Sequence, residues 1–137
     1  MILVDTGPLV ALFDPKDDSH ERAKNTLAGL REPLLTTVPV LTEAFHLLGP
    51  SSRGARALRS FVSRGGAAPW YLSNESLVRA FELMDRYADH PMDLADASLV
   101  VAAEVTRALR VFTIDRNDFD TYRARIGRGH RKFTVID

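Results

Sequence analysis

Short apolar runs alternate with longer segments of helical periodicity along the chain, and this alternation restricts the fold more than any other feature of the sequence. The apolar runs occupy residues 2–4, 33–38, 70–72, 111–114 and 133–136. Strands separated by helical patterns predict a parallel sheet with helices on both of its faces. The sequence therefore indicates an α/β fold.

Length and composition predict one domain over residues 1–137, because 137 residues with 45% hydrophobic content can enclose one core. The absence of Cys excludes disulfide frameworks, thiolate zinc sites and cysteine nucleophiles. Any metal site must then use oxygen or imidazole ligands. No apolar run approaches the roughly 20 residues that cross a bilayer, and the first residues do not resemble a secretory signal. We expect a soluble, cytoplasmic protein.

Capping residues and prolines predict where the helices begin. The candidates for these starts are Ser19, Pro39, Ser51 or Ser52, and Asn74. Residues 94–109 are apolar almost all round, which predicts a helix with few faces in solvent. Residues 117–125 are expected to form a short helix, and residues 127–130 a loop.

Four acidic residues lie at the ends of apolar strand runs or near the starts of apolar helices. Asp5 and Asp115 directly follow apolar strand runs, and Glu43 and Asp96 lie near the starts of apolar helices. In a parallel sheet, the carboxyl ends of the strands and the helix starts that follow them share one edge, where ligands usually bind. We therefore expect these side chains to meet.

Each acid also has a structural explanation. Asp93 is best explained as a helix N-cap, with Asp96 favoured in the first turn by the helix dipole. Asp5 could stabilise the turn that follows it, and Asp115 could cap the next helix. Glu43 could lie on the solvated edge of its helix. Taken singly, Asp5 and Asp115 leave structure and function about equally open, whereas the structural explanation is weaker for Glu43.

A cluster of carboxylates needs compensation for its charge. Two carboxylates about 5 Å apart repel by roughly 3 kcal/mol at an effective dielectric constant of 20. The group must raise its pKa values or hold a cation. Hard oxygen ligands suit Mg²⁺ or Mn²⁺, and such a site can activate water and neutralise charge on a phosphodiester.

Four short motifs carry a resemblance to a known family. In order they are Val-Asp-Thr-Gly-Pro-Leu at 4–9, Val-Leu-Thr-Glu at 40–43, Leu-Ala-Asp-Ala at 94–97 and Thr-Ile-Asp-Arg-Asn-Asp-Phe at 113–119. Together they resemble the successive motifs of PIN-domain ribonucleases, and most closely those of VapC-type toxins. The resemblance implies a three-layer α/β/α sandwich with a central parallel sheet. It also implies a metal-dependent endoribonuclease that uses metal-activated water and leaves a 5′-phosphate and a 3′-hydroxyl.

The resemblance also implies residue roles and partners. The catalytic and metal-binding positions for Mg²⁺ or Mn²⁺ match Asp5, Glu43, Asp96 and Asp115. Supporting positions match Thr6, Thr113, Asp118 and Asp93, of which Asp93 is mainly expected as a cap. Proteins of this kind usually form homodimers, and a small antitoxin with a tail in the active-site groove neutralises them.

The formal net charge of zero argues against a nucleic-acid partner only if the acids are evenly spread. With four acids assigned to one site, 14 acidic residues remain against 18 basic ones. Candidate RNA-binding residues are Arg53, Arg56, Arg59 and Arg64 on one helix, a C-terminal group, and Arg116 of the fourth motif. The C-terminal group consists of Arg123, Arg125, Arg128, Arg131 and Lys132. For each group taken separately, a solvated helix face or pairing with a protein partner is a slightly better explanation than RNA binding.

Two other functions remain open on the sequence. One is a different Mg²⁺-dependent phosphotransfer or phosphatase domain, although Asp5 lacks the second acid or the nearby Lys that such a site normally has. The other is a non-catalytic module that binds RNA or protein.

The four histidines, His20, His46, His90 and His130, are scattered and are expected to be solvated or close to helix caps. The RNA target, the number of metal ions and the identity of an antitoxin cannot be inferred from the sequence.

Overall fold

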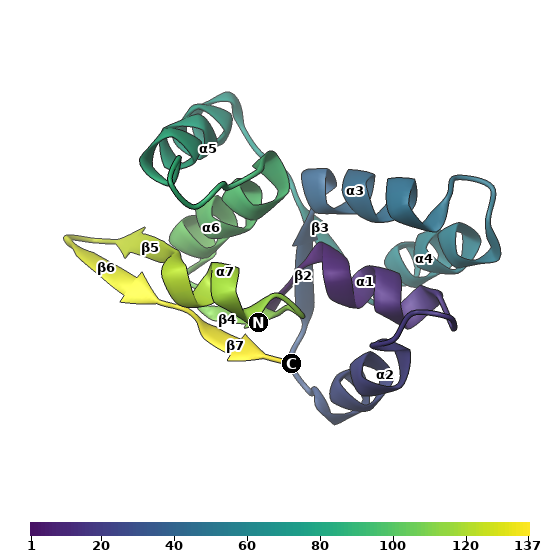
Figure 1. The fold of residues 1–137 in the computed structure, drawn as a ribbon. Helices are drawn as coiled ribbons and strands as arrows, with labels where there is room; N and C mark the ends of the chain where they lie inside the picture. Colours follow the sequence, from purple (N-terminus) through teal and green to yellow (C-terminus); the bar gives the residue numbers. More distant parts are fainter.

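The computed structural model describes residues 1–137 and has a five-stranded sheet at its centre (Figure 1). The strands follow the order β3-β2-β1-β4-β7, and every neighbouring pair is parallel. They are β1 (Ile2–Val4), β2 (Leu34–Thr37), β3 (Ala68–Trp70), β4 (Arg110–Phe112) and β7 (Thr134–Ile136). The predicted α/β fold with a central parallel sheet is confirmed.

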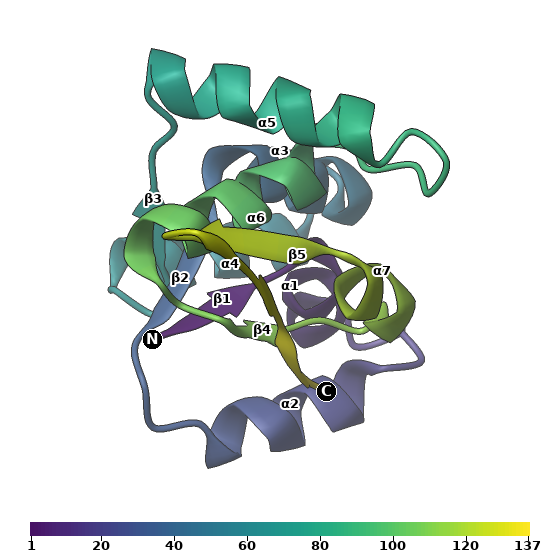
Figure 2. The same cartoon turned by 90° about the vertical axis from the view of Figure 1, so that its left-hand side faces the viewer.

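Seven helices accompany the sheet. They are α1 (Thr6–Phe13), α2 (His20–Gly29), α3 (Val38–Leu48), α4 (Arg53–Ser63), α5 (Asn74–Arg86), α6 (Leu94–Thr106) and α7 (Arg116–Thr121). Figure 2 shows α2 on one side of the sheet, with α6 and the outer helix α5 on the other. Eight residues of α6 are buried, as its apolar sequence predicted. None of the helices has the length and apolar character needed to cross a bilayer.

Side-chain caps fix several helix starts. Asp93 accepts a hydrogen bond from the Asp96 amide at 2.8 Å, which confirms its predicted role as the N-cap of α6. Ser73 caps α5, so the prediction of Asn74 as the cap was wrong by one residue. Ser19 precedes α2 but makes no side-chain cap bond. The helix boundaries next to the acidic residues are therefore fixed mainly by side chains that accept amide hydrogen bonds.

The order in which the chain adds strands to the sheet reverses beside β1. The chain runs from β1 to β2 and β3 on one side, and later adds β4 and β7 on the other. Ile2, Leu3, Val4, Val111 and Phe112 are at most 1% exposed and form the centre of the core. Because the connections diverge at the carboxyl ends of β1 and β4, a ligand crevice is expected there.

The chain after α7 differs from the prediction. Residues 117–125 do not form one helix, and residues 127–130 are not simply a loop. Instead, α7 ends at Thr121 and an antiparallel hairpin follows, made of β5 (Arg123–Ile126) and β6 (Gly129–Lys132). Residues 123–126 alternate arginines with the apolar Ala124 and Ile126, and Gly127 has the positive φ of 61° that a two-residue hairpin turn requires. This period of two indicates a strand.

The strands β3 and β4 also have boundaries that differ from the prediction. The edge strand β3 begins at Ala68, which pairs with Leu35, and it ends at Trp70, where the predicted run began. The strand β4 ends at Phe112 rather than Ile114. Thr113 therefore comes first after β4, and Asp115 does not directly follow a strand.

Candidate functional site

A cavity of about 640 Å³ lies at the carboxyl ends of β1 and β4. Seven of its thirteen lining residues are acidic and none is Lys, Arg or His. The acidic residues are Asp5, Asp17, Glu43, Asp93, Asp96, Asp115 and Asp118. The structure thus brings together all six acids that the sequence singled out. It adds Asp17, which lies between α1 and α2 and carried no signal in the sequence.

Asp5 directly follows β1 and is only 8% exposed. Its Oδ1 accepts a hydrogen bond from the Thr6 amide at 2.8 Å, so it caps α1, and its Oδ2 accepts one from the Thr113 hydroxyl at 2.8 Å. Burial raises the pKa of Asp5 to about 6, and the negative charges of Glu43 and Asp93 add to this rise. The two hydrogen bonds oppose it. Asp5 is therefore both a helix cap and a buried acid of the cavity.

Thr113 connects Asp5 to the chain beyond β4. Its side chain is fully buried, and its Oγ1 also accepts a hydrogen bond from the Asp115 amide at 3.1 Å. Asp115 precedes α7, but its carboxylate makes no capping hydrogen bond and the residue is exposed. Capping therefore does not explain this acid, although the sequence allowed that explanation.

Asp96 lies in the first turn of α6, and its Oδ2 accepts a hydrogen bond from the Tyr122 hydroxyl at 3.0 Å. Burial, followed by the charges of Asp5 and Asp93, raises the pKa of Asp96 to about 8, whereas the hydrogen bond from Tyr122 lowers it. Burial and the charge of Asp96 also raise the pKa of Tyr122, so this hydroxyl stays protonated and donates.

The sequence had suggested that Glu43 lies near the start of its helix. In the structure Glu43 is the sixth residue of α3 and lies in the second turn. The helix begins earlier because Thr37 caps it through the Val40 amide at 3.3 Å. The Thr37 and Ser98 hydroxyls form a buried hydrogen bond of 2.6 Å, which ties the start of α3 to α6. Glu43 lines the cavity from this helix.

Asp118 in α7 pairs with His90, whose Nε2 lies 2.8 Å from Oδ1 of Asp118. Burial raises the pKa of Asp118, and the contact with His90 lowers it. The sequence had suggested only a solvated or cap-adjacent role for His90, so this pairing was missed, as was the contact of Tyr122 with Asp96. The sequence contained one usable signal, the aromatic residues close to the fourth motif.

The donor chemistry of the cavity fits a hard divalent cation. Thr6 Oγ1 is buried beside Asp5 and has no hydrogen-bond partner, which is unusual for a buried hydroxyl. The carboxylates supply oxygen ligands, and burial together with neighbouring negative charge raises the pKa of Asp5 and of Asp96. No group of three or more acidic or imidazole side chains is already arranged around a single point as a metal site. The residues therefore fit such a cation by their chemistry, without forming a closed cage.

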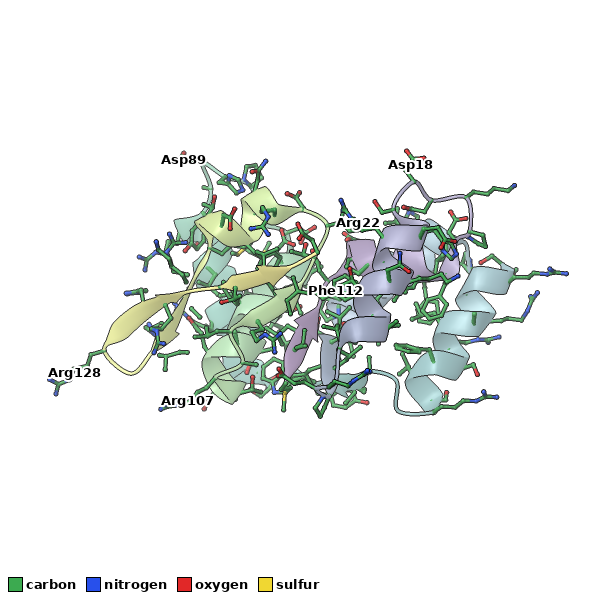
Figure 3. All side chains as sticks on the ribbon, turned by 90° about the horizontal axis from the view of Figure 1, so that it is seen from below. Asp18, Arg22, Asp89, Arg107, Phe112 and Arg128 are labelled. Atoms are coloured by element: carbon green, nitrogen blue, oxygen red, sulfur yellow. The ribbon has the colours of Figure 1, made fainter.

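The candidate RNA-binding arginines lie outside the cavity. Arg53, Arg56 and Arg59 are on α4, with Arg64 at its end, and Arg116 forms an exposed ion pair with Asp137 at 3.3 Å. The C-terminal basic group lies along the β5–β6 hairpin, with Arg128 at the tip of the hairpin (Figure 3). The charged side-chain groups of Arg125, Arg128, Arg131 and Lys132 form no ion pair. These cations are therefore free to bind an anionic partner.

Comparison with known proteins gives a family and a relative of similar length. Residues 2–124 match the family described as PIN domain. The ribonuclease VapC26 of Mycobacterium tuberculosis (strain ATCC 25618 / H37Rv) is 28% identical over 138 residues, which cover 98% of this chain and 99% of that protein. The matched range includes every acid of the cavity.

Two solved structures share the fold. VapC20 of Mycobacterium tuberculosis, described as a toxin that cleaves the sarcin-ricin loop, superposes with a TM-score of 0.79 and 22% identity, covering 86% of this chain and 92% of that one. A toxin-antitoxin complex from Klebsiella pneumoniae has a chain with a TM-score of 0.67 and 19% identity, covering 88% of this chain and 92% of that one. At these identities the likeness shows the fold.

Proposed function

The chain belongs to the PIN-domain family, and on that premise we propose that it is an endoribonuclease dependent on Mg²⁺ or Mn²⁺, the toxin of a type II toxin–antitoxin pair. One observation supports this proposal most strongly. Seven carboxylates from separate segments line one cavity at the switch point of a parallel sheet, with no basic side chain among the lining residues. A cation and a phosphodiester together suit such a cavity.

Asp5, Asp96 and Asp115 would hold the cation, and Glu43 would complete the site or orient a water molecule. When bound, the cation supplies activation of water and neutralisation of charge on the phosphate. Two of these residues are already oriented by donors. Asp5 is held by the Thr6 amide and the Thr113 hydroxyl, and Asp96 by the Tyr122 hydroxyl. The Glu43 carboxylate can accept a proton from water in the cavity.

The distribution of charge supports RNA as the substrate. Seven of the 18 acidic residues line the cavity, which leaves 11 acidic residues against 18 basic ones in the rest of the chain. Fifteen of these basic residues are Arg, whose planar guanidinium suits phosphate. The rest of the molecule is therefore positive enough to attract a phosphate backbone, although the net charge is zero.

We extend the proposal to a homodimer and to a small antitoxin as partners. The resemblance to VapC-type toxins and the fold shared with the Klebsiella pneumoniae toxin-antitoxin complex support these partners. Val38, Val78 and Phe81 are large apolar side chains that are 44%, 58% and 49% exposed, and this exposure suits contact with another chain.

The alternative of a phosphotransfer or phosphatase domain has little support. A site with a nucleophilic Asp normally includes a Lys, and none of the three Lys residues lines the cavity. The test is incubation of the protein with structured and single-stranded RNAs in Mg²⁺, Mn²⁺ or EDTA. Cleavage that needs the metal and leaves 5′-phosphate ends supports the proposal. RNA binding without cleavage under either metal would indicate a non-catalytic binding module instead.

A further inference from the structure

Tyr122 lies behind the acidic cavity and does not line it. The residue follows α7, precedes β5 and is 0% exposed. Its hydroxyl donates a hydrogen bond to Oδ2 of Asp96 at 3.0 Å, across 26 positions in the sequence. A fully buried tyrosine thus contacts a carboxylate of the cavity from the protein interior.

The ring of Tyr122 is held by three other rings. The Tyr87 ring lies 5.1 Å away at an interplanar angle of 69°, and the Phe119 ring lies 5.4 Å away at 82°. The His90 ring is 5.8 Å away at 84°. Edge-to-face contacts of this kind stabilise aromatic packing. Because neighbouring rings confine the ring of Tyr122, its hydroxyl has a fixed position.

The carboxylate of Asp96 needs a fixed partner if its orientation is to be defined. The terminal torsion of an Asp side chain has a broad energy well, so the carboxylate turns easily when it is unpaired. Tyr122 fixes Oδ2, and no donor of the chain bonds to Oδ1. Asp5 is oriented in a similar way by the Thr113 hydroxyl. Each of these carboxylates therefore lines the cavity while a buried hydroxyl restrains one of its oxygens.

We propose that Tyr122 is a positioning residue that orients Asp96 for binding of the divalent cation. This inference rests on the proposed function, because it assigns Tyr122 a role in that same site. Tyr122 does not line the cavity and undergoes no chemical change. Groups that orient metal ligands commonly affect metal affinity strongly when they are removed.

A structural role for the same hydroxyl makes a different prediction. If the Asp96 carboxylate merely satisfies a buried Tyr122 hydroxyl, removal of that hydroxyl changes stability and leaves cation affinity intact. Tyr122→Phe removes the hydroxyl and keeps the ring. Tyr87→Phe is a matched control, because its hydroxyl accepts a hydrogen bond from the Arg123 amide at 3.0 Å in the same aromatic cluster and contacts no carboxylate.

The test is Mn²⁺ binding to the full chain by isothermal titration calorimetry. We expect Tyr122→Phe to bind Mn²⁺ about 10-fold more weakly than wild type, whereas Tyr87→Phe keeps the wild-type dissociation constant. The rise in melting temperature on adding Mn²⁺ gives a second readout. Each variant is compared with its own metal-free melting temperature, so a loss of stability does not obscure the result. In RNA cleavage, Tyr122→Phe should lower kcat and leave KM unchanged.

The outcomes separate this inference from the proposed function. Equal Mn²⁺ affinity in wild type and Tyr122→Phe would overturn the positioning role while the nuclease proposal stands. An equal loss in Tyr122→Phe and Tyr87→Phe would also overturn it, because the aromatic cluster and not the contact with Asp96 would then be responsible. Undiminished cleavage of RNA by wild type in EDTA would overturn the proposed function and, with it, this inference.

Discussion

The hydroxyl of Thr113 donates a hydrogen bond to Oδ2 of Asp5 at 2.8 Å, and it joins the ends of the neighbouring strands β1 and β4. Thr113→Val keeps the shape of the side chain but leaves Oδ2 of the buried Asp5 carboxylate without its donor. We expect the free energy of unfolding to fall by about 1.5–3 kcal/mol at pH values where Asp5 is ionised, because hydrogen bonds to charged groups contribute this much. Urea denaturation measures the change.

A second threonine provides the control for this variant. Thr134 lies in β7, is exposed and makes no side-chain hydrogen bond. Thr134→Val should therefore change stability little. Equal effects of the two substitutions would contradict a specific role for the bond between Thr113 and Asp5.

Replacing Asp5 by Asn should stabilise the metal-free protein above pH 6. Asn caps a helix about as well as Asp, so the capping contact with the Thr6 amide is kept. Burial raises the pKa of Asp5 to about 6, so above this pH the wild-type protein carries a buried negative charge that the substitution removes. We expect a melting temperature several degrees higher in EDTA, measured by circular dichroism. A lower melting temperature would show that the ionised Asp5 mainly stabilises the turn into α1.

Stability of the metal-free protein should fall as the pH rises from acidic to mildly alkaline values. The pKa values of Asp5 and Asp96 are raised from 3.8 to about 6 and about 8, so the folded state binds protons more tightly than the unfolded state. Their contribution to stability is complete below pH 3.8 and is lost as the pH rises through about 6 and then about 8. Urea denaturation in EDTA across this range measures the loss.

Two variants test the origin of this pH dependence. Asp96→Asn should flatten the part of the profile that extends to about pH 8, whereas Asp85→Asn, at an exposed position on α5, should keep the wild-type profile. A wild-type stability that is constant or that increases over this range would contradict the assignment of unpaired, buried carboxylates.

The arginines of α4 should contribute to RNA affinity by neutralising phosphates. Arg53 and Arg59 have no carboxylate within 4.0 Å, and the double variant Arg53→Gln/Arg59→Gln removes both charges. We expect weaker binding of single-stranded RNA and a shallower dependence of affinity on salt. The log–log slope should fall by roughly 0.7 for each phosphate that the variant no longer neutralises. Filter binding in EDTA measures both quantities without cleavage.

Arg107→Gln removes one charge outside α4 and is compared with the single variants Arg53→Gln and Arg59→Gln, each of which also removes one charge. Arg107 lies just beyond the last residue of α6, at the opposite end of that helix from Asp96, and has no ion pair. Arg107→Gln should leave the salt slope unchanged. If Arg107→Gln lowers the RNA affinity and the salt slope as much as each single α4 variant does, only the total charge matters and α4 does not bind phosphate.

The fold and the acidic cavity were predictable to a large extent because they depend on the order of strands and helices along the sequence. A parallel sheet brings the carboxyl ends of its strands to one edge, so Asp5 and the residues after β4 were expected at the same edge, and the structure makes β1 and β4 neighbours. Asp96 followed the same logic through its place in the first turn of α6. These positions follow from local pattern and topology alone.

The contacts behind the cavity were not predictable because they depend on tertiary packing. Tyr122 reaches Asp96 across 26 positions, and His90 reaches Asp118 across 28. Tyr122 lies between the end of α7 at Thr121 and the start of the hairpin at Arg123, where the sequence had suggested a longer helix. Asp17 lines the cavity from a loop, and its position depends on how α2 packs.

The most direct test of the proposed function is single-turnover cleavage of RNA in Mn²⁺ by wild type, Asp96→Asn and Asp85→Asn. Asp96 lines the cavity and has a pKa raised to about 8, whereas Asp85 is an exposed acid on α5 outside it. We predict that folded Asp96→Asn loses cleavage and that Asp85→Asn retains the wild-type rate. Undiminished cleavage by folded Asp96→Asn would contradict the proposed function.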